Sequence, residues 1–135
     1  MAAMNTVRVN KKGADRARNG HLWIYRSDLV DVDAAGGSVV SVKDERGNFV
    51  GQALLSDASQ IALRFLTAST EEIDRAWWQR RIRAAAGRRT IPPDTTAYRL
   101  IYSEGDLLPS LIVDVYDDVF VMQTLSLGTD ALKSL

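Results

Sequence analysis

Short apolar runs separated by turn residues are the feature that most constrains the fold of this chain. Turn chemistry is clearest at Gly47-Asn48, where we expect glycine and asparagine to supply positive backbone dihedral angles. Residues 12–19 predict one helical turn closed by Gly20. The apolar runs of the first half are residues 6–9, 21–25, 39–42, 49–55 and 61–66. Several short strands at such close spacing predict a small β-barrel.

The pattern then changes to that of a helix. Residues 70–88 contain no proline and many good helix formers, and Ser69 with Glu72 fits a capping box. At 3.6 residues per turn, an apolar half is shared by Ile73, Trp77, Trp78, Ile82, Ala84 and Ala85, and it is interrupted by Asp74 and Arg81. We expect the two tryptophans to be core residues, with a base-stacking platform as the alternative. We also expect Arg81 to pack over an indole face.

A second set of strands follows the helix. Residues 90–96 include two adjacent prolines, which end helical geometry. Apolar strands are then predicted at residues 98–102, 111–115 and 119–125, and Gly128 opens a further helix. The fold class is therefore α+β, with a small β-barrel followed by an α+β unit that begins near residue 67.

Composition excludes several kinds of chemistry. The chain of 135 residues has no cysteine and a single histidine, His21, which excludes a disulfide framework, a thiolate metal site and a cysteine nucleophile. No GxGxxG or GxxxxGK[ST] motif is present. We assign no catalytic and no metal-binding residue, and no cofactor to this chain. His21, on an apolar segment, is expected to be packed and hydrogen-bonded, with a ligand role as the alternative.

One acidic group needs a separate interpretation. Glu104, Asp106 and Asp114 could bind a metal or perform acid-base work, but two of them lie beside turn residues and the third lies in a strand. We expect these three carboxylates to cap turns or face solvent.

No stretch of the sequence approaches the length of a membrane span. The chain starts Met-Ala-Ala-Met-Asn, without a charged segment followed by an apolar core. We expect a cytoplasmic protein with no membrane partner.

Positive charge is concentrated locally although the formal net charge is zero. Residues 1–27 carry six basic residues against Asp15 alone, and residues 71–89 carry six arginines against three acids. A phosphate backbone responds to local basic surface more than to net charge, so these stretches could face RNA. A solvated charged surface is the simpler alternative.

Four blocks of sequence resemble a known family. They are Gly20-His-Leu-Trp-Ile-Tyr25; Ser56-Asp-Ala-Ser-Gln-Ile61 with Arg64; Trp78-Gln-Arg-Arg-Ile82 with Ala85; and Tyr98-Arg-Leu-Ile-Tyr-Ser-Glu-Gly-Asp106 with Leu108-Pro109 and Ile112-Val-Asp114. Their order and spacing resemble the N-terminal part of the class I S-adenosylmethionine-dependent 23S ribosomal RNA cytosine-5 methyltransferases. In that family a PUA domain, a central EEHEE domain and a Rossmann catalytic domain follow one another. The chain departs from the family at Ser110, where glycine is usual.

The resemblance implies a division of the chain and a role for it. Residues 5–67 would form a PUA-like RNA-binding domain, and residues 68–135 an EEHEE-type central domain, possibly truncated. The Rossmann domain, with the S-adenosylmethionine site and the catalytic cysteine, would be absent. We therefore expect an RNA-binding and substrate-positioning N-terminal fragment, inactive alone, of an enzyme involved in rRNA processing.

Five residues are the candidates for contact with ribosomal RNA. We expect phosphates to be neutralised by Arg16, Arg18 and Arg26, and a sugar or an unpaired base to be contacted by His21 and Trp23.

The competing hypothesis is a protein-interaction domain with no role in RNA binding. Trp77, Trp78 and the strand edge at residues 119–125 would then form a homodimer or partner surface. A self-contained enzyme is a third and weaker hypothesis.

Overall fold

The computed structural model describes residues 5–135. The expectation of a cytoplasmic location rests partly on residues 1–4, which lie outside the described residues.

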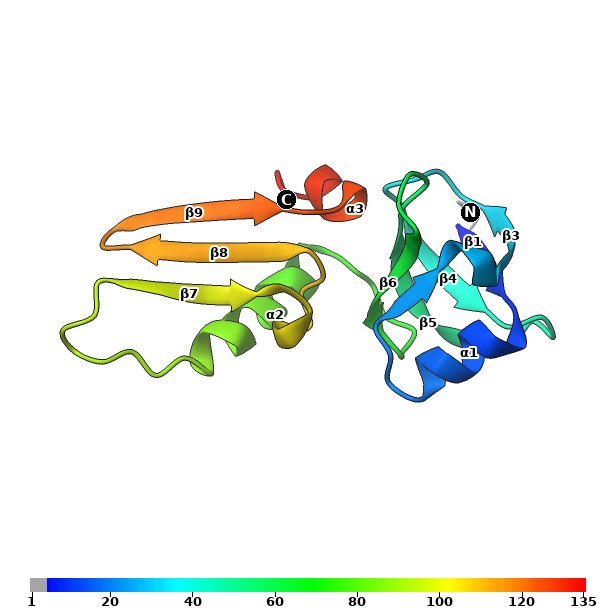
Figure 1. The fold of residues 1–135 in the computed structure, drawn as a ribbon, viewed down its shortest axis with the longest axis horizontal. Helices are drawn as coiled ribbons and strands as arrows, with labels where there is room; N and C mark the ends of the chain where they lie inside the picture. Colours follow the sequence, from blue (N-terminus) through cyan, green and yellow to red (C-terminus); the bar gives the residue numbers. More distant parts are fainter. Residues whose placement is uncertain (1–4) are drawn as a thin grey trace.

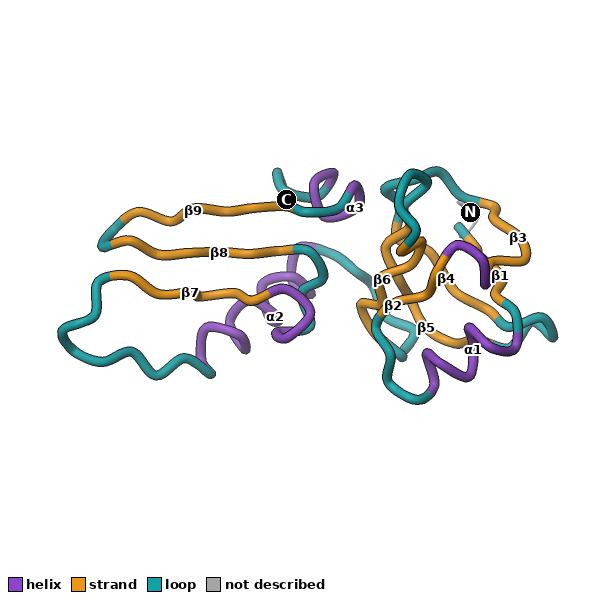
Figure 2. Tube along the Cα trace, viewed as in Figure 1, coloured by secondary structure: helices purple, strands orange, loops and turns teal. Residues whose placement is uncertain are grey.

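The first half of the chain is a curled six-stranded sheet with one helix (Figures 1 and 2). Its strands run in the order β2-β6-β5-β4-β1-β3, and every pair is antiparallel except β1 and β4. The sheet forms a half-barrel, as the strand pattern predicted. Its elements are β1 (Thr6–Val9), α1 (Lys11–Arg18), β2 (Trp23–Tyr25), the 3-10 turn η1 (Arg26–Asp28), β3 (Leu29–Asp33), β4 (Val39–Lys43), β5 (Phe49–Leu55) and β6 (Ile61–Thr67).

Strand β3 was not predicted from the sequence. It pairs with β1 at the edge of the sheet, where Val30 and Val32 are exposed and Asp31 forms an ion pair with Arg8. A strand that buries almost nothing has no strong burial pattern, so its alternation of apolar and acidic residues was not recognised.

The turn between β4 and β5 depends on Asp44 more than on asparagine geometry. Gly47 has a φ of 85°, as expected, whereas Asn48 is not in the left-handed region. The Asn48 backbone N–H and side-chain amide instead donate to the Asp44 carboxylate, at 2.9 and 3.1 Å. The sequence interpretation was therefore correct for glycine and wrong for asparagine.

The helix of the second half starts later than predicted. Helix α2 spans Arg75–Gly87, and the Asp74 carboxylate caps it by accepting from the Trp77 N–H at 2.8 Å. The capping box at Ser69 does not form, because residues 67–71 are hydrogen-bonded to one another and to the half-barrel. There the Glu71 N–H donates to Gln52 Oε1, and the Thr67 hydroxyl donates to the Glu71 carboxylate.

The second sheet has three antiparallel strands, as predicted. They are β7 (Ala97–Tyr102), β8 (Leu111–Tyr116) and β9 (Val119–Thr124), with the 3-10 turn η2 (Ser103–Asp106) after β7 and the short helix α3 (Leu127–Ala131) after β9. In Figure 1 this sheet and α2 lie beside the half-barrel, with α3 at the end of β9 that faces it. Gly128 is needed in α3, because a Cβ atom there would lie 2.9 Å from the side chain of Leu54.

Two apolar cores hold the chain together, and the second contains residues from both halves. The first lies inside the half-barrel and includes Val7, Ile24 and Leu63. In the second, Leu54 of β5 and Leu66 of β6 pack with residues of α2 and the three-stranded sheet. Strands β5 and β6 therefore bury side chains on both of their faces.

The tryptophans of α2 are core residues, as predicted. Trp77 is 1% exposed and Trp78 8% exposed, and their rings meet edge to face at 5.0 Å. Arg81 lies over the Trp77 ring, 4.6 Å from its centroid, as expected from their spacing. Ala84 is exposed, so the predicted apolar face was too wide by one residue.

Asp106 is a buried carboxylate that joins α2 to the loop after β7. It is 3% exposed and accepts hydrogen bonds from Arg88 at 3.0 Å, from Arg89, and from the Tyr102 backbone N–H at 2.6 Å. Burial alone would raise the pKa of Asp106, but the Tyr102 amide and the two arginines together hold that pKa below its usual value. The ionised form therefore stabilises the fold.

We predict that Asp106→Asn lowers the free energy of unfolding at pH 7 by about 2–3 kcal/mol, because hydrogen bonds to a buried charge are lost. Since the folded pKa lies below the unfolded value of about 3.9, this contribution is present above that value and is lost as the pH falls through the folded pKa. Urea denaturation at pH 7 and pH 3 should show the difference between the wild type and the variant shrinking at the lower pH. Asp118→Asn, at an exposed turn, is the control and should change stability by less than about 0.5 kcal/mol.

Candidate nucleic-acid interface

Three of the five predicted RNA-contacting residues lie around one surface cavity. A hollow with a volume of about 310 Å³ is lined by Arg16, His21 and Trp23, together with Gly20, Leu22, Tyr25 and Glu104. The cavity combines aromatic rings, a cation and a carboxylate. This is a set of groups that can stack on a nucleobase and contact its backbone and edge.

Local structure explains how α1 and β2 present these side chains together. Gly20 has a φ of 91°, which lets the chain reverse direction after α1. The His21 backbone N–H then donates to the Arg16 carbonyl oxygen at 3.2 Å and holds the start of β2 against the helix end. In β2 the alternation of a strand buries Ile24 fully and leaves Trp23 and Tyr25 on the outer face, 38% and 39% exposed.

Arg16 is the cation of the cavity. Its guanidinium lies over the Tyr25 ring, 5.2 Å from the centroid. It forms no ion pair with any of residues 5–135, so its charge is not neutralised by a carboxylate of the described chain. A stacked guanidinium of this kind is pre-oriented and still able to contact a phosphate.

Glu104 reaches the cavity from the other half of the molecule. The Trp23 indole Nε1–H donates to Glu104 Oε1 at 3.2 Å, and the Ser103 hydroxyl donates to Oε2. Sequence reasoning placed neither Tyr25 nor Glu104 in this site. The two-residue spacing from Trp23 could have identified Tyr25, whereas nothing local connects Trp23 with a residue so far along the chain.

Arg18 and Arg26 point elsewhere. Arg18 forms an ion pair with Asp44 at 3.0 Å. Hydrogen bonds to the Asp44 carboxyl, those from Asn48 most of all and then those from Arg18 and Arg46, keep its pKa well below the usual range. Arg26 donates to the carbonyl oxygens of Ser56, at 2.5 Å, and Ser59. Both guanidinium groups therefore stabilise turns of the half-barrel in this structure.

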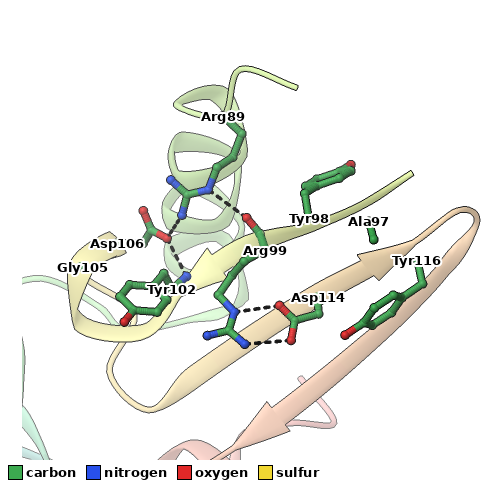
Figure 3. A pocket seen from close by; sticks show the side chains of 9 residues that line it. All are labelled: Arg89, Ala97, Tyr98, Arg99, Tyr102, Gly105, Asp106, Asp114 and Tyr116. Atoms are coloured by element: carbon green, nitrogen blue, oxygen red, sulfur yellow. Dashed lines mark hydrogen bonds and ion pairs between the residues drawn. The ribbon is translucent and has the colours of Figure 1, made fainter. Parts of the chain in front are cut away.

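A second, more open cavity lies on the second sheet (Figure 3). Its volume is about 710 Å³, and its lining includes Tyr102 and Tyr116. It also includes the ion pair in which Arg99 contacts Asp114 at 2.7 and 3.0 Å. The hydrogen bond and charge of Arg99 lower the pKa of Asp114. Because its charges pair with one another, this cavity offers less free positive charge than the one at Arg16.

Within residues 5–135, no group of three or more His, Asp or Glu side chains is arranged to hold a metal ion. Asp106 and Asp114 are instead bound by arginines. No helix in this part of the chain is long and apolar enough to cross a bilayer.

Comparison with known proteins identifies relatives of both halves. Residues 7–68 match the model of the PUA-like domain family. Over 126 residues the chain is 39% identical to a ribosomal RNA large subunit methyltransferase I from Shewanella amazonensis, covering 89% of this chain and 31% of the relative. Over 127 residues it is 35% identical to a ribosomal RNA large subunit methyltransferase from Deinococcus radiodurans, covering 87% and 31%. The chain thus spans about a third of the length of the curated relatives it matches.

Solved structures agree on the fold. A candidate SAM-dependent methyltransferase from Streptococcus mutans superposes with a TM-score of 0.86 at 17% identity, covering 97% of this chain and 35% of that one. A second candidate methyltransferase, solved in complex with SAH, gives 0.83 at 18% identity, covering 96% and 35%. The chain therefore has a PUA-like half-barrel at residues 7–68 within an α+β fold. Most of its length is similar to a segment that makes up about a third of each of the two ribosomal RNA large subunit methyltransferases.

Proposed function

We propose that this chain binds ribosomal RNA and positions it for a large-subunit ribosomal RNA methyltransferase. The observation that carries the proposal is the convergence of Arg16, His21, Trp23 and Tyr25 on one exposed cavity of the PUA-like half-barrel. An exposed indole can stack on an unpaired base, and a free guanidinium beside it can neutralise the adjoining phosphate.

The chemistry of the longer protein is part of the same proposal. Its relatives are named as ribosomal RNA large subunit methyltransferases, and a structural neighbour was solved with SAH, so we propose S-adenosylmethionine as methyl donor. Cytosine C5 is proposed as the atom modified on the family resemblance of the four sequence blocks alone. Within residues 5–135 no glycine-rich turn leads from a strand into a helix. We therefore assign no residue of this chain to the donor. A cytoplasmic location is proposed separately, from the sequence and the named role of the relatives.

The division of labour within the chain follows from this role. We propose residues 5–67 as the RNA-binding domain and residues 68–135 as a central domain that fixes its position. Support comes from the second core, in which Leu54 and Leu66 of the half-barrel pack with Trp77 of α2.

We predict that Arg16→Ala weakens binding to a structured fragment of large-subunit ribosomal RNA and lowers the slope of log K against log salt by about 0.7–0.9, because one phosphate contact is lost. A fluorescence anisotropy titration at several salt concentrations measures both. Arg83→Ala, which removes an exposed arginine of α2, is the matched control and should leave the slope unchanged. Equal slopes for Arg16→Ala and the wild type would contradict the proposed contact.

Trp23 supplies a direct optical test of stacking. Since Trp77 and Trp78 are buried, we predict that RNA quenches wild-type tryptophan fluorescence and does not quench Trp23→Phe. Trp23→Ala should lose about 1–3 kcal/mol of binding free energy, the usual contribution of one stacked base. Quenching that persists without Trp23 would show that the base is bound elsewhere.

A second candidate function, self-association, is favoured by the edge of β9. Among the strands of residues 5–135 it pairs with β8 only, and its side chains Val119, Phe120, Val121 and Met122 are all exposed. An unpaired apolar edge can add a second copy of itself about a twofold axis. Trp77 and Trp78 do not belong to such a surface, because both are buried, so that part of the interaction hypothesis is wrong.

We predict that the chain forms a concentration-dependent dimer in sedimentation velocity if β9 pairs with a second copy, and that Val121→Lys removes it by placing a charge on the strand. Val30→Lys makes the same change on β3, another exposed edge strand, and should leave the dimer intact. A monomer at all concentrations would exclude this function.

A further inference from the structure

Glu104 is held toward the cavity by an unusually constrained loop. Three non-glycine residues of the segment between β7 and β8 have positive φ: Ser103 at 48°, Leu107 at 58° and Ser110 at 62°. Such conformations cost on the order of 1 kcal/mol or more each and persist only where the surroundings enforce them. Strain of this kind concentrates at functional sites.

Several contacts enforce that loop. The Ser110 backbone N–H donates to the Ser103 hydroxyl at 2.9 Å, and that hydroxyl in turn donates to Glu104. Buried Asp106, with its two arginines, anchors the same turn to α2. The Glu104 carboxylate is thus a pre-oriented group and not a free surface acid.

The Glu104 carboxylate can accept further hydrogen bonds but cannot donate one. An ionised carboxylate has about four acceptor positions, and among the described residues the Trp23 indole and the Ser103 hydroxyl donate to it. Arg64, which lies directly opposite Trp23 in the β2–β6 register, interacts electrostatically with this carboxylate from the half-barrel side. A ligand group that meets the open side of Glu104 must therefore donate a hydrogen bond.

We infer that the cavity selects an unpaired base with an amino group on its Watson–Crick edge, such as cytosine, over uracil. The base stacks on Trp23 while Glu104 accepts from its exocyclic amino group, and Arg16 contacts the neighbouring phosphate. Carboxylates read the cytosine amino group in this way, whereas uracil presents a carbonyl oxygen at the same position. This inference rests on the proposed RNA-binding function and adds base selectivity to it.

Dimensions and composition of the cavity suit this occupant. Its volume of about 310 Å³ lies at the lower end of the range of about 300–1,000 Å³ that is usual for small-molecule sites. A contact between Trp23 and Glu104 that only joined the two halves would predict no difference between bases. Base preference is therefore the property that separates a recognition role from a structural one.

The test compares short oligocytidylate and oligouridylate of equal length, bound to the whole chain at low salt. We expect the wild type to bind oligocytidylate about tenfold more tightly. Glu104→Gln keeps the size and the acceptor for Trp23, but its amide can also donate to the uracil carbonyl. The preference should therefore fall to about one or reverse. Asp118→Asn removes one carboxylate charge at the distant β8–β9 turn and should retain the preference.

The ratio of the two dissociation constants is the readout, because it is insensitive to a uniform loss of affinity. A ratio near one in the wild type, or a ratio that Glu104→Gln leaves unchanged, overturns the inference. If ribosomal RNA still binds with a salt slope that depends on Arg16, the proposed function survives that failure. If no RNA binds and Arg16→Ala has no effect, both are wrong.

Discussion

Burial on both faces of β5 and β6 is the constraint on which the rest of the structure depends. Inward side chains such as Leu63 fill the half-barrel, while Leu54 and Leu66 enter the core built around Trp77. Arg81 reinforces the same junction by stacking on Trp77 and donating to the Leu66 carbonyl oxygen at 3.0 Å. Because the two cores share these strands, movement of one half against the other would expose apolar surface from both.

This junction decides what the candidate interface can recognise. The half-barrel alone presents an indole, a phenol ring and the Arg16 guanidinium, which has no carboxylate partner in the described part of the chain. These groups suit stacking and phosphate contact without regard to sequence. Only the second half supplies Glu104, the group to which we assign the distinction between base edges. Under the proposed function, a fixed relation between the halves is what adds base selectivity to RNA binding.

Ion pairing separates the arginines that organise the fold from those that remain available. Arg18, Arg88, Arg89 and Arg99 all bind carboxylates, and Arg26 binds carbonyl oxygens of a nearby turn. Counting basic residues along the sequence therefore overstated the free positive surface. What distinguishes Arg16 is its stacking on Tyr25 in place of a carboxylate partner, a distinction that only the folded chain makes visible.

The sequence by itself determined the elements whose signals are local: five strands of the half-barrel, the three later strands, the burial of Trp77 and Trp78, and the stacking of Arg81. These depend on periodicity over a few residues. Tertiary structure decided the start of α2, the exposed strand β3 and the composition of the interface. The contact between Trp23 and Glu104 joins residues 81 positions apart, and only the packing of the two halves brings them together.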